Sequence, residues 1–149
     1  MSPSSLTDHT GYWLRMVSNA VSREFARKIG LADVTVAEWV FMRALFDDQP
    51  VPPTVLATKM GMTKGAISKL AERLISKGLV LRTEHETDKR AHALSLSEAG
   101  MARIPALSAI ADENDQRFFE ALGPDERRTL VQLLRVLAER HGLSAAPVD

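Results

Sequence analysis

Two short helical segments that a glycine separates, followed by a pair of extended segments, constrain the fold of this chain most strongly. The first segment, residues 54–60, follows two prolines that suit the start of a helix. Gly61 then supplies the backbone freedom that a sharp bend needs. A second helix follows between Thr63, a suitable N-cap, and Gly78, a suitable C′ residue. This order predicts a helix, a tight turn and a second helix.

The second helix is amphipathic. At about 100° per residue its apolar side chains fall on one face and its polar side chains on the other. The apolar face suits a core, and the polar face is free for a partner. The apolar set is Ile67, Leu70, Ala71, Leu74 and Ile75, and the polar set is Lys64, Gly65, Ser68, Lys69, Glu72, Arg73 and Ser76.

The segments that follow this helix predict a β-hairpin. Residues 80–84 and 91–96 have the character of strands, and a polar run joins them as a loop that would project as a wing. Helix, turn, helix and hairpin together make a winged helix-turn-helix, whose second helix presents its N-terminal residues to base edges in the DNA major groove. The residues at that end of the helix are Lys64, Gly65, Ser68 and Lys69.

The distribution of charge favours the same stretch as a nucleic-acid surface. The chain has 19 Lys or Arg and 19 Asp or Glu, so its formal net charge is zero. Residues 54–92 hold eight of the cationic and four of the anionic residues. Local charge governs contact with phosphates more than the net charge does, although an isolated charge excess is more often only a solvated face.

Composition bounds the remaining classes of protein. A chain of 149 residues with 45% hydrophobic residues favours one domain with its own core. It contains no cysteine, which excludes disulfides, thiolate metal sites and cysteine redox chemistry. No run approaches the roughly 18 apolar residues of a membrane span, and residues 1–10 lack the apolar core of a signal peptide. We therefore expect a soluble, cytoplasmic protein that does not bind a membrane.

Helices are also expected on the N-terminal side of this stretch. Residues 11–30 carry apolar side chains at helical spacing. Thr35 and Glu38 form a capping box, in which each side chain accepts a hydrogen bond from a free backbone N–H at the start of a mostly buried helix. Residues 47–53 contain three prolines and predict a loop.

Two further helices are expected after the hairpin. Ser97 can cap a helix that runs towards Ala121, and Pro105 in its interior should kink or break it. Gly123, followed by a proline and two carboxylates, marks the start of a last helix. Its wide apolar stripe comprises Leu130, Val131, Leu133, Leu134, Val136 and Leu137.

The motifs of the hairpin resemble those of the MarR family of bacterial transcriptional regulators. The family's wing signature is Asp-x-Arg, then alternating Leu with Ser or Thr, then Gly. This chain has Asp88-Lys89-Arg90, Leu94-Ser95-Leu96-Ser97 and Gly100, preceded by Leu74 and by Gly78-Leu79-Val80. The resemblance covers roughly residues 10–140. It implies a mostly α fold with a small β-hairpin wing, in which N- and C-terminal helices form a dimerisation region.

The resemblance also implies an organisation and a function. Residues 1–149 would form a single MarR-like domain, with dimerisation helices over 11–30 and 98–142 and a winged helix-turn-helix DNA-binding lobe over 35–96. Such a protein is a homodimeric, sequence-specific regulator that binds a pseudo-palindromic operator in double-stranded DNA. We expect a repressor that a small, often aromatic, effector releases, with no cofactor. For a generic chain, packing of the terminal stripes within one subunit would be the better expectation.

Site residues follow from the motifs and from the polar face of the second helix. Arg90, oriented by Asp88, is expected to enter the minor groove, unless the two residues merely close the hairpin as an exposed ion pair. Lysine, arginine and serine side chains can reach phosphates or base edges. The DNA-binding set is Lys59, Thr63, Lys64, Gly65, Ser68, Lys69, Arg73, Arg82, Asp88, Lys89 and Arg90. Candidates for an effector cleft are Tyr12, Trp13, Met16, Trp39 and Met42, each of which would equally suit an ordinary core.

Other chemistry is weakly indicated. A metal site is suggested only by the acidic and histidine residues of the hairpin, Glu84, His85, Glu86, Asp88 and His92, whose spacing matches no zinc motif. No phosphate-binding loop, nucleophile elbow or catalytic triad order is present, so we expect neither an enzyme nor a metal site. The alternative function is a winged-helix protein-interaction module without DNA binding. The basic helix tip and the Asp88-x-Arg90 motif argue against it.

Overall fold

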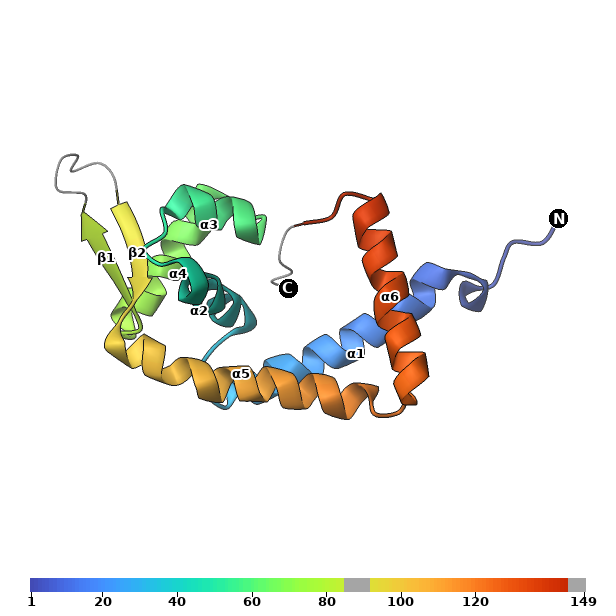
Figure 1. The fold of residues 1–149 in the computed structure, drawn as a ribbon. Coiled ribbons are helices and arrows are strands. Elements are labelled where there is room, and N and C mark those ends of the chain that lie inside the picture. The colour runs from blue at the N-terminus through green and yellow to red at the C-terminus, as the bar shows by residue number, and fades with distance from the viewer. Residues whose placement is uncertain (85–91, 145–149) are drawn as a thin grey trace.

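The computed structural model describes residues 1–84 and 92–144, which form a mostly helical chain with one small antiparallel sheet (Figure 1). None of the described helices is long and apolar enough to cross a membrane. The elements in chain order are a 3₁₀ turn η1 (Leu6–Asp8), α1 (Thr10–Gly30), α2 (Val36–Asp48), α3 (Pro53–Met60), α4 (Lys64–Ser76), β1 (Val80–Glu84), β2 (His92–Leu96), α5 (Glu98–Phe119) and α6 (Pro124–Arg140).

Elements α2, α3, α4, β1 and β2 form the hairpin lobe, which lies at one end of the molecule (Figure 1). The predicted winged helix-turn-helix is therefore confirmed. The turn between α3 and α4 has Gly61 in the left-handed region (φ 62°), and the residue after the α4 C-cap, Gly78, is also left-handed (φ 74°). Both positions favour glycine because a Cβ would be strained there.

The two strands pair antiparallel, from Val80 opposite Leu96 to Glu84 opposite His92. A third segment that we predicted to be loop also pairs with this sheet. Val51 donates to and accepts from Leu94 at N···O distances of 2.9 and 2.8 Å. The loop prediction for 47–53 is thus wrong in part, since α2 continues to Asp48 and Val51 adds a bridge to β2.

One continuous core holds the hairpin lobe to α1 and α5. On α4 it takes Ile67, Leu70 and Leu74, each of which is at most 4% exposed. Full burial of such side chains contributes roughly 1.5–3 kcal/mol each. The rest of the core comprises Ile29, Val34, Trp39, Phe41, Met42, Leu45, Val51, Leu56, Ala57, Met60, Ala71, Leu79, Val80, Leu94, Leu96, Ile104 and Leu107.

Helix α5 connects the hairpin lobe to the terminal helices α1 and α6 (Figure 1). Ser97 caps it, as predicted, and accepts a hydrogen bond from Gly100 N at 3.0 Å. The helix continues through Pro105, so the prediction that this proline could break it is wrong. Pro105 is exposed, whereas Ile104 and Leu107 are buried in the core. The side of the helix that packs against the core is therefore continuous. The backbone hydrogen bond that proline removes lies on the side open to water.

Candidate nucleic-acid interface

Helix α4 presents the polar face that its sequence pattern predicts. Thr63 Oγ1 caps the helix by accepting from Ala66 N at 3.1 Å. This leaves other N–H groups of the first turn free, at the positive end of the helix dipole. The exposed residues of α4 and its cap include all six predicted DNA-binding positions on this element: Thr63, Lys64, Gly65, Ser68, Lys69 and Arg73.

Three of the predicted basic contacts are held in ion pairs. Arg73 Nη2 lies 3.4 Å from Glu38 Oε1, Arg82 Nη2 lies 2.7 Å from Glu72 Oε1, and Lys59 Nζ lies 3.1 Å from Asp48 Oδ2. The pair between Arg82 and Glu72 joins β1 to α4. All three cations remain more than a third exposed, and the pairs of Lys59 and Arg82, whose carboxylate partners are exposed too, contribute little to stability. They can still orient the cations towards a phosphate.

Some of the predicted site lies outside the described residues. This applies to Asp88, Lys89 and Arg90, the wing positions, and to the metal hypothesis at His85 and Glu86. Among residues 1–84 and 92–144, no group of three His, Cys, Asp or Glu could hold a metal ion. The wing contact therefore stays a prediction.

Glu38 forms a second polar feature beside α4, which we call the Glu38 cluster: Glu38, Thr35, Arg73 and Lys77. The capping box is confirmed, with Thr35 N donating to Glu38 Oε1 at 2.8 Å and Glu38 N donating to Thr35 Oγ1 at 3.1 Å. Capping motifs did not predict that Glu38 is fully buried or that Lys77 Nζ donates to it at 3.2 Å.

The charge state of Glu38 follows from this environment. Burial acts to raise the pKa of Glu38, but the hydrogen bond from the Thr35 N–H and the charges of Lys77 and Arg73 outweigh it. The pKa of the carboxyl therefore lies below its ordinary value. Glu38 is an anion at neutral pH although water does not reach it.

The five candidates for an effector cleft are not brought together. Trp39 lines a cavity of about 210 Å³ between α1, α2 and α5, together with Val21, Ser22, Phe25, Ala111, Asn114 and Asp115. Met42 is fully buried in the core. Tyr12, Trp13 and Met16 lie near the start of α1, where Trp13 is 49% and Met16 46% exposed.

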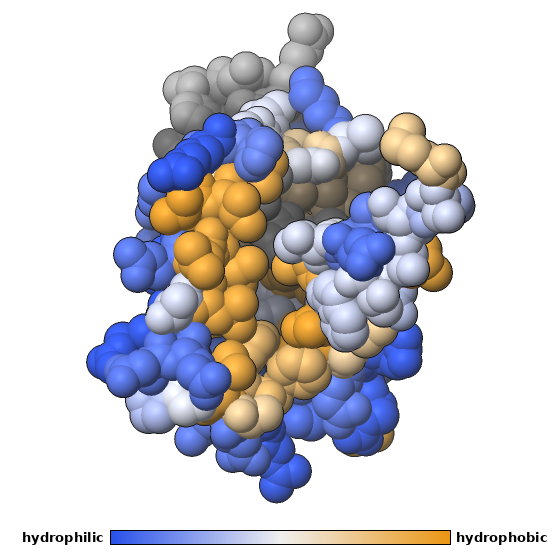
Figure 2. Space-filling view, turned by 90° about the vertical axis from the view of Figure 1, so that its right-hand side faces the viewer, coloured by the Kyte–Doolittle hydropathy of each residue, from blue (hydrophilic) through white to orange (hydrophobic). Residues whose placement is uncertain are grey.

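The exposed apolar side chains of α1 and α6 form what we call the terminal apolar face. Figure 2 views the side of the molecule that carries these helices and shows hydrophobic groups gathered in a band with hydrophilic groups at its edges. Helix α6 has no buried residue. The face comprises Trp13, Leu14, Met16 and Val17 of α1 and Val131, Leu133, Leu134 and Leu137 of α6, each 39% to 56% exposed.

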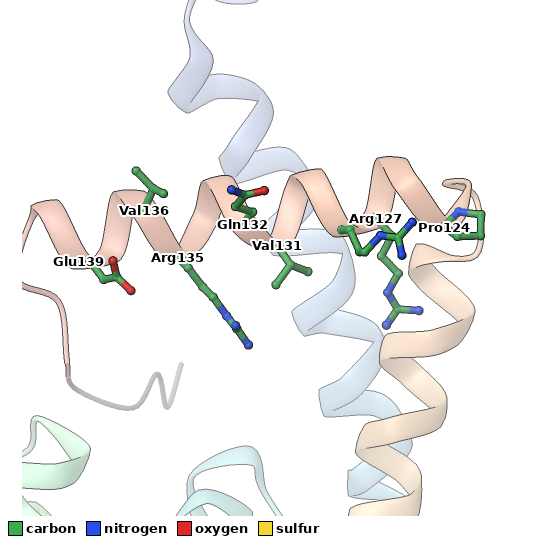
Figure 3. Close-up of a pocket in the computed structure, with 8 residues that line it drawn as sticks. Pro124, Arg127, Val131, Gln132, Arg135, Val136 and Glu139 are labelled. Carbon is green, nitrogen blue, oxygen red and sulfur yellow. The ribbon is translucent and has the colours of Figure 1, made fainter.

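A groove of about 750 Å³ runs along α6, and every residue that lines it belongs to that helix (Figure 3). It includes Val131 and Val136 beside Arg127, Arg128 and Arg135. A groove that one helix alone lines has no opposite wall within the described part of the chain.

Comparison with known proteins gives one family. The family model described as the MarR family matches residues 34–92. The transcriptional regulator HosA of Escherichia coli O157:H7 is 30% identical over 105 residues, which is 70% of this chain and 78% of HosA.

Solved structures resemble the fold over most of its length. A probable transcriptional regulator from Pseudomonas aeruginosa is 31% identical, with a TM-score of 0.78 over 89% of this chain and 99% of the other. A mutant of MarR from Escherichia coli complexed with operator DNA is 25% identical, with a TM-score of 0.76 over 85% of this chain and 91% of the other.

Proposed function

Because the chain belongs to the MarR family and is a DNA-binding transcriptional regulator of that type, we propose that it binds a pseudo-palindromic operator as a homodimer and represses transcription until a small ligand releases it. Like its relatives, which are transcriptional regulators, it is a regulator and not an enzyme. The observation that carries the proposal is the exposed, capped and basic N-terminal half of α4.

The DNA contacts are assigned by their position on this surface. Lys64, Gly65, Ser68 and Lys69 lie on the first turns of α4, where a recognition helix meets base edges. Lys59, Arg73 and Arg82 lie around them and carry charge suited to phosphates. Arg90 would enter the minor groove. The basic exposed face favours DNA over the alternative of a protein-interaction module, whose contact surface would be more apolar.

The terminal apolar face supports the homodimer. One copy of α4 reads one half-site, so two copies must be held about one DNA turn apart. The exposed leucines of α6, the exposed apolar side chains of α1 and the one-sided groove along α6 are what a second copy of this chain would cover. Residues 11–30 and 98–142 would then be the dimerisation helices.

The pocket beside Trp39 supports the proposal that a small ligand binds this protein. It is lined by aromatic and aliphatic side chains with the buried amide of Asn114, and it lies where α1 and α5 meet α2 of the hairpin lobe. A small aromatic ligand there would push these helices apart. We expect such a ligand to quench Trp39 fluorescence and weaken operator binding, and a Trp39→Phe variant to lose the quenching. Release from DNA without any effect on Trp39 would place the effector elsewhere.

A titration against the DNA upstream of its own gene tests the proposal. We expect a shifted complex at protein concentrations that leave random DNA free, and a steep loss of affinity between two salt concentrations because phosphate contacts release counterions. Equal affinity for both DNAs would contradict a sequence-specific regulator. An increase in transcription of the target gene on deletion of the protein is the expected sign of repression.

A further inference from the structure

Glu38 has an arrangement that helix capping alone does not require. Its Oε1 atom accepts from Thr35 N at 2.8 Å and from Lys77 Nζ at 3.2 Å, and Arg73 Nη2 lies 3.4 Å from the same oxygen. Its Oε2 atom is buried and has no hydrogen-bond partner within the described part of the chain. The carboxylate as a whole is 0% exposed.

A buried carboxylate with an unpaired oxygen is costly. A glutamine at the same position could accept the Thr35 N–H through its own Oε1 and complete the capping box at lower desolvation cost. The negative charge strengthens the interaction of Glu38 with two cations, Arg73 and Lys77. Hydrogen bonds that involve ionised groups are about twice as strong as neutral ones. The charge of Glu38 therefore acts on Arg73 and Lys77.

Both cations belong to the end of α4. Arg73 lies in its last turn and Lys77 is its C-cap residue. Lys77 Nζ also donates to the carbonyl of Asp33 at 2.8 Å, in the turn between α1 and α2. Glu38, at the start of α2, thus holds the end of the proposed recognition helix through one oxygen atom, and Lys77 also joins that end to the turn before α2.

The Arg73 guanidinium is shared between this cluster and the outer surface. Its side chain is 52% exposed, and its Nη2 atom lies near Glu38. A guanidinium has five N–H donors in a fixed fork, so the remaining donors are free to meet a phosphate bidentately. This contact places the buried carboxylate beside the guanidinium.

We propose that Glu38 is a positioning residue for DNA binding, because its buried carboxylate orients Arg73 on α4 towards the DNA backbone. The inference rests on the proposed DNA contacts of α4 and goes beyond them, since Glu38 itself does not reach DNA. It predicts that the charge of Glu38 contributes to operator affinity only while Arg73 is present.

A double-mutant cycle tests this. Glu38→Gln should weaken operator binding about tenfold, the cost of losing a charged partner, and should weaken binding to random DNA as well, because a contact to phosphate carries no base information. In an Arg73→Ala background the same Glu38→Gln change should alter operator affinity by about twofold or less. Urea unfolding of each variant checks that it is folded at the temperature of the binding assay.

Lys69→Ala provides the matched control, because Lys69 is an exposed cation of α4 that makes no ion pair with Glu38. Its effect and that of Glu38→Gln should add. If Glu38→Gln weakens operator binding equally with and without Arg73, Glu38 does not act through Arg73 and the proposal is overturned.

A second variant keeps the proposal testable if Glu38→Gln does not fold. Arg73→Lys keeps the charge but not the fork, so binding to the operator and to random DNA should both weaken. Operator binding by Arg73→Lys equal to that of the wild type overturns the proposal. A wild-type protein that does not prefer its own upstream DNA overturns the proposed function itself, and this inference with it.

Discussion

Gly100 lies where the first turn of α5 meets the end of the helix-turn-helix. A Cβ on Gly100 would lie 2.1 Å from the carbonyl oxygen of Leu79. Ser97 fixes this approach, since its N donates to Leu79 O at 3.0 Å and its Oγ donates to Gly78 O at 2.6 Å. The glycine of the wing signature is therefore required by close packing between two backbones.

Gly100→Ala should destabilise the fold by roughly 2–3 kcal/mol, because the added methyl group forces α5 away from the turn after α4. Urea unfolding of the purified variant measures this. Gly11→Ala is the control, since a Cβ there meets nothing within 4 Å and should leave stability unchanged or slightly raised. A Gly100→Ala protein as stable as the wild type would mean that the backbones separate at no cost.

Glu38 makes stability depend on pH in a defined direction. Its pKa is below the ordinary value of 4.5 in the folded chain, so the unfolded chain binds the proton more readily as pH falls below that value. The stabilisation is present above about pH 4.5 and is lost as pH falls through the lower folded pKa. We expect the gap in unfolding free energy between wild type and Glu38→Gln to shrink over this acidic range. A gap that is constant with pH would show that the charge of Glu38 does not stabilise the fold.

Local patterns predicted individual residues well where the contacts are local. Thr35, Thr63 and Ser97 all cap helices as their sequence context indicated. The same patterns could not reveal that Glu38 would meet Lys77, because that contact joins residues 39 positions apart. Burial of the carboxylate depends on how α2 and α4 pack, which no capping motif encodes.

At the scale of elements, the approach of α4 to DNA is the main expectation. Gly65 is exposed on its first turn, and a Cβ there would have only Thr63 Oγ1 nearby, at 4.0 Å. The fold therefore accepts alanine at this position, and a helix gains roughly 0.5–1 kcal/mol from replacing an interior glycine. Any effect of the substitution on DNA binding then reports on the DNA side of the contact.

Gly65→Ala should weaken operator binding by about 1–3 kcal/mol while unfolding shows a protein at least as stable as the wild type. The reason is that the backbone of α4 is expected to lie close to the base edges there. Unchanged affinity of Gly65→Ala would mean that α4 meets the groove through another part of its surface.

Element boundaries were predictable where helical periodicity or glycine marked them, as for α3 and α4. Two features were not. The bridge of Val51 to Leu94 depends on β2, which is remote in sequence, and a proline-rich segment gives no local sign of it. Helix α5 passes through Pro105 because Ile104 and Leu107 pack into the core and outweigh the local preference.

At the scale of the whole molecule, the single chain leaves its terminal apolar face uncovered. Leu133 is 56% exposed and Leu137 is 49% exposed. Replacing both with Glu should leave the monomer folded and abolish the dimer, since charges would be buried between subunits. Sedimentation measures the mass. Leu31→Glu, which changes an 80% exposed leucine in the turn after α1, should stay dimeric. A variant with both glutamates that remains dimeric would place the interface elsewhere.

The central claim is that two copies of the chain, joined through α1 and α6, read one operator with two α4 helices. The most direct measurement is the mass of the complex that the protein forms with a short duplex of its own upstream DNA. We expect two protomers per duplex for the wild type, and at least a roughly thousandfold weaker binding for the Leu133 and Leu137 variant, on the order of the 4–10 kcal/mol that separates specific from non-specific binding. A single protomer bound with undiminished sequence preference would contradict it.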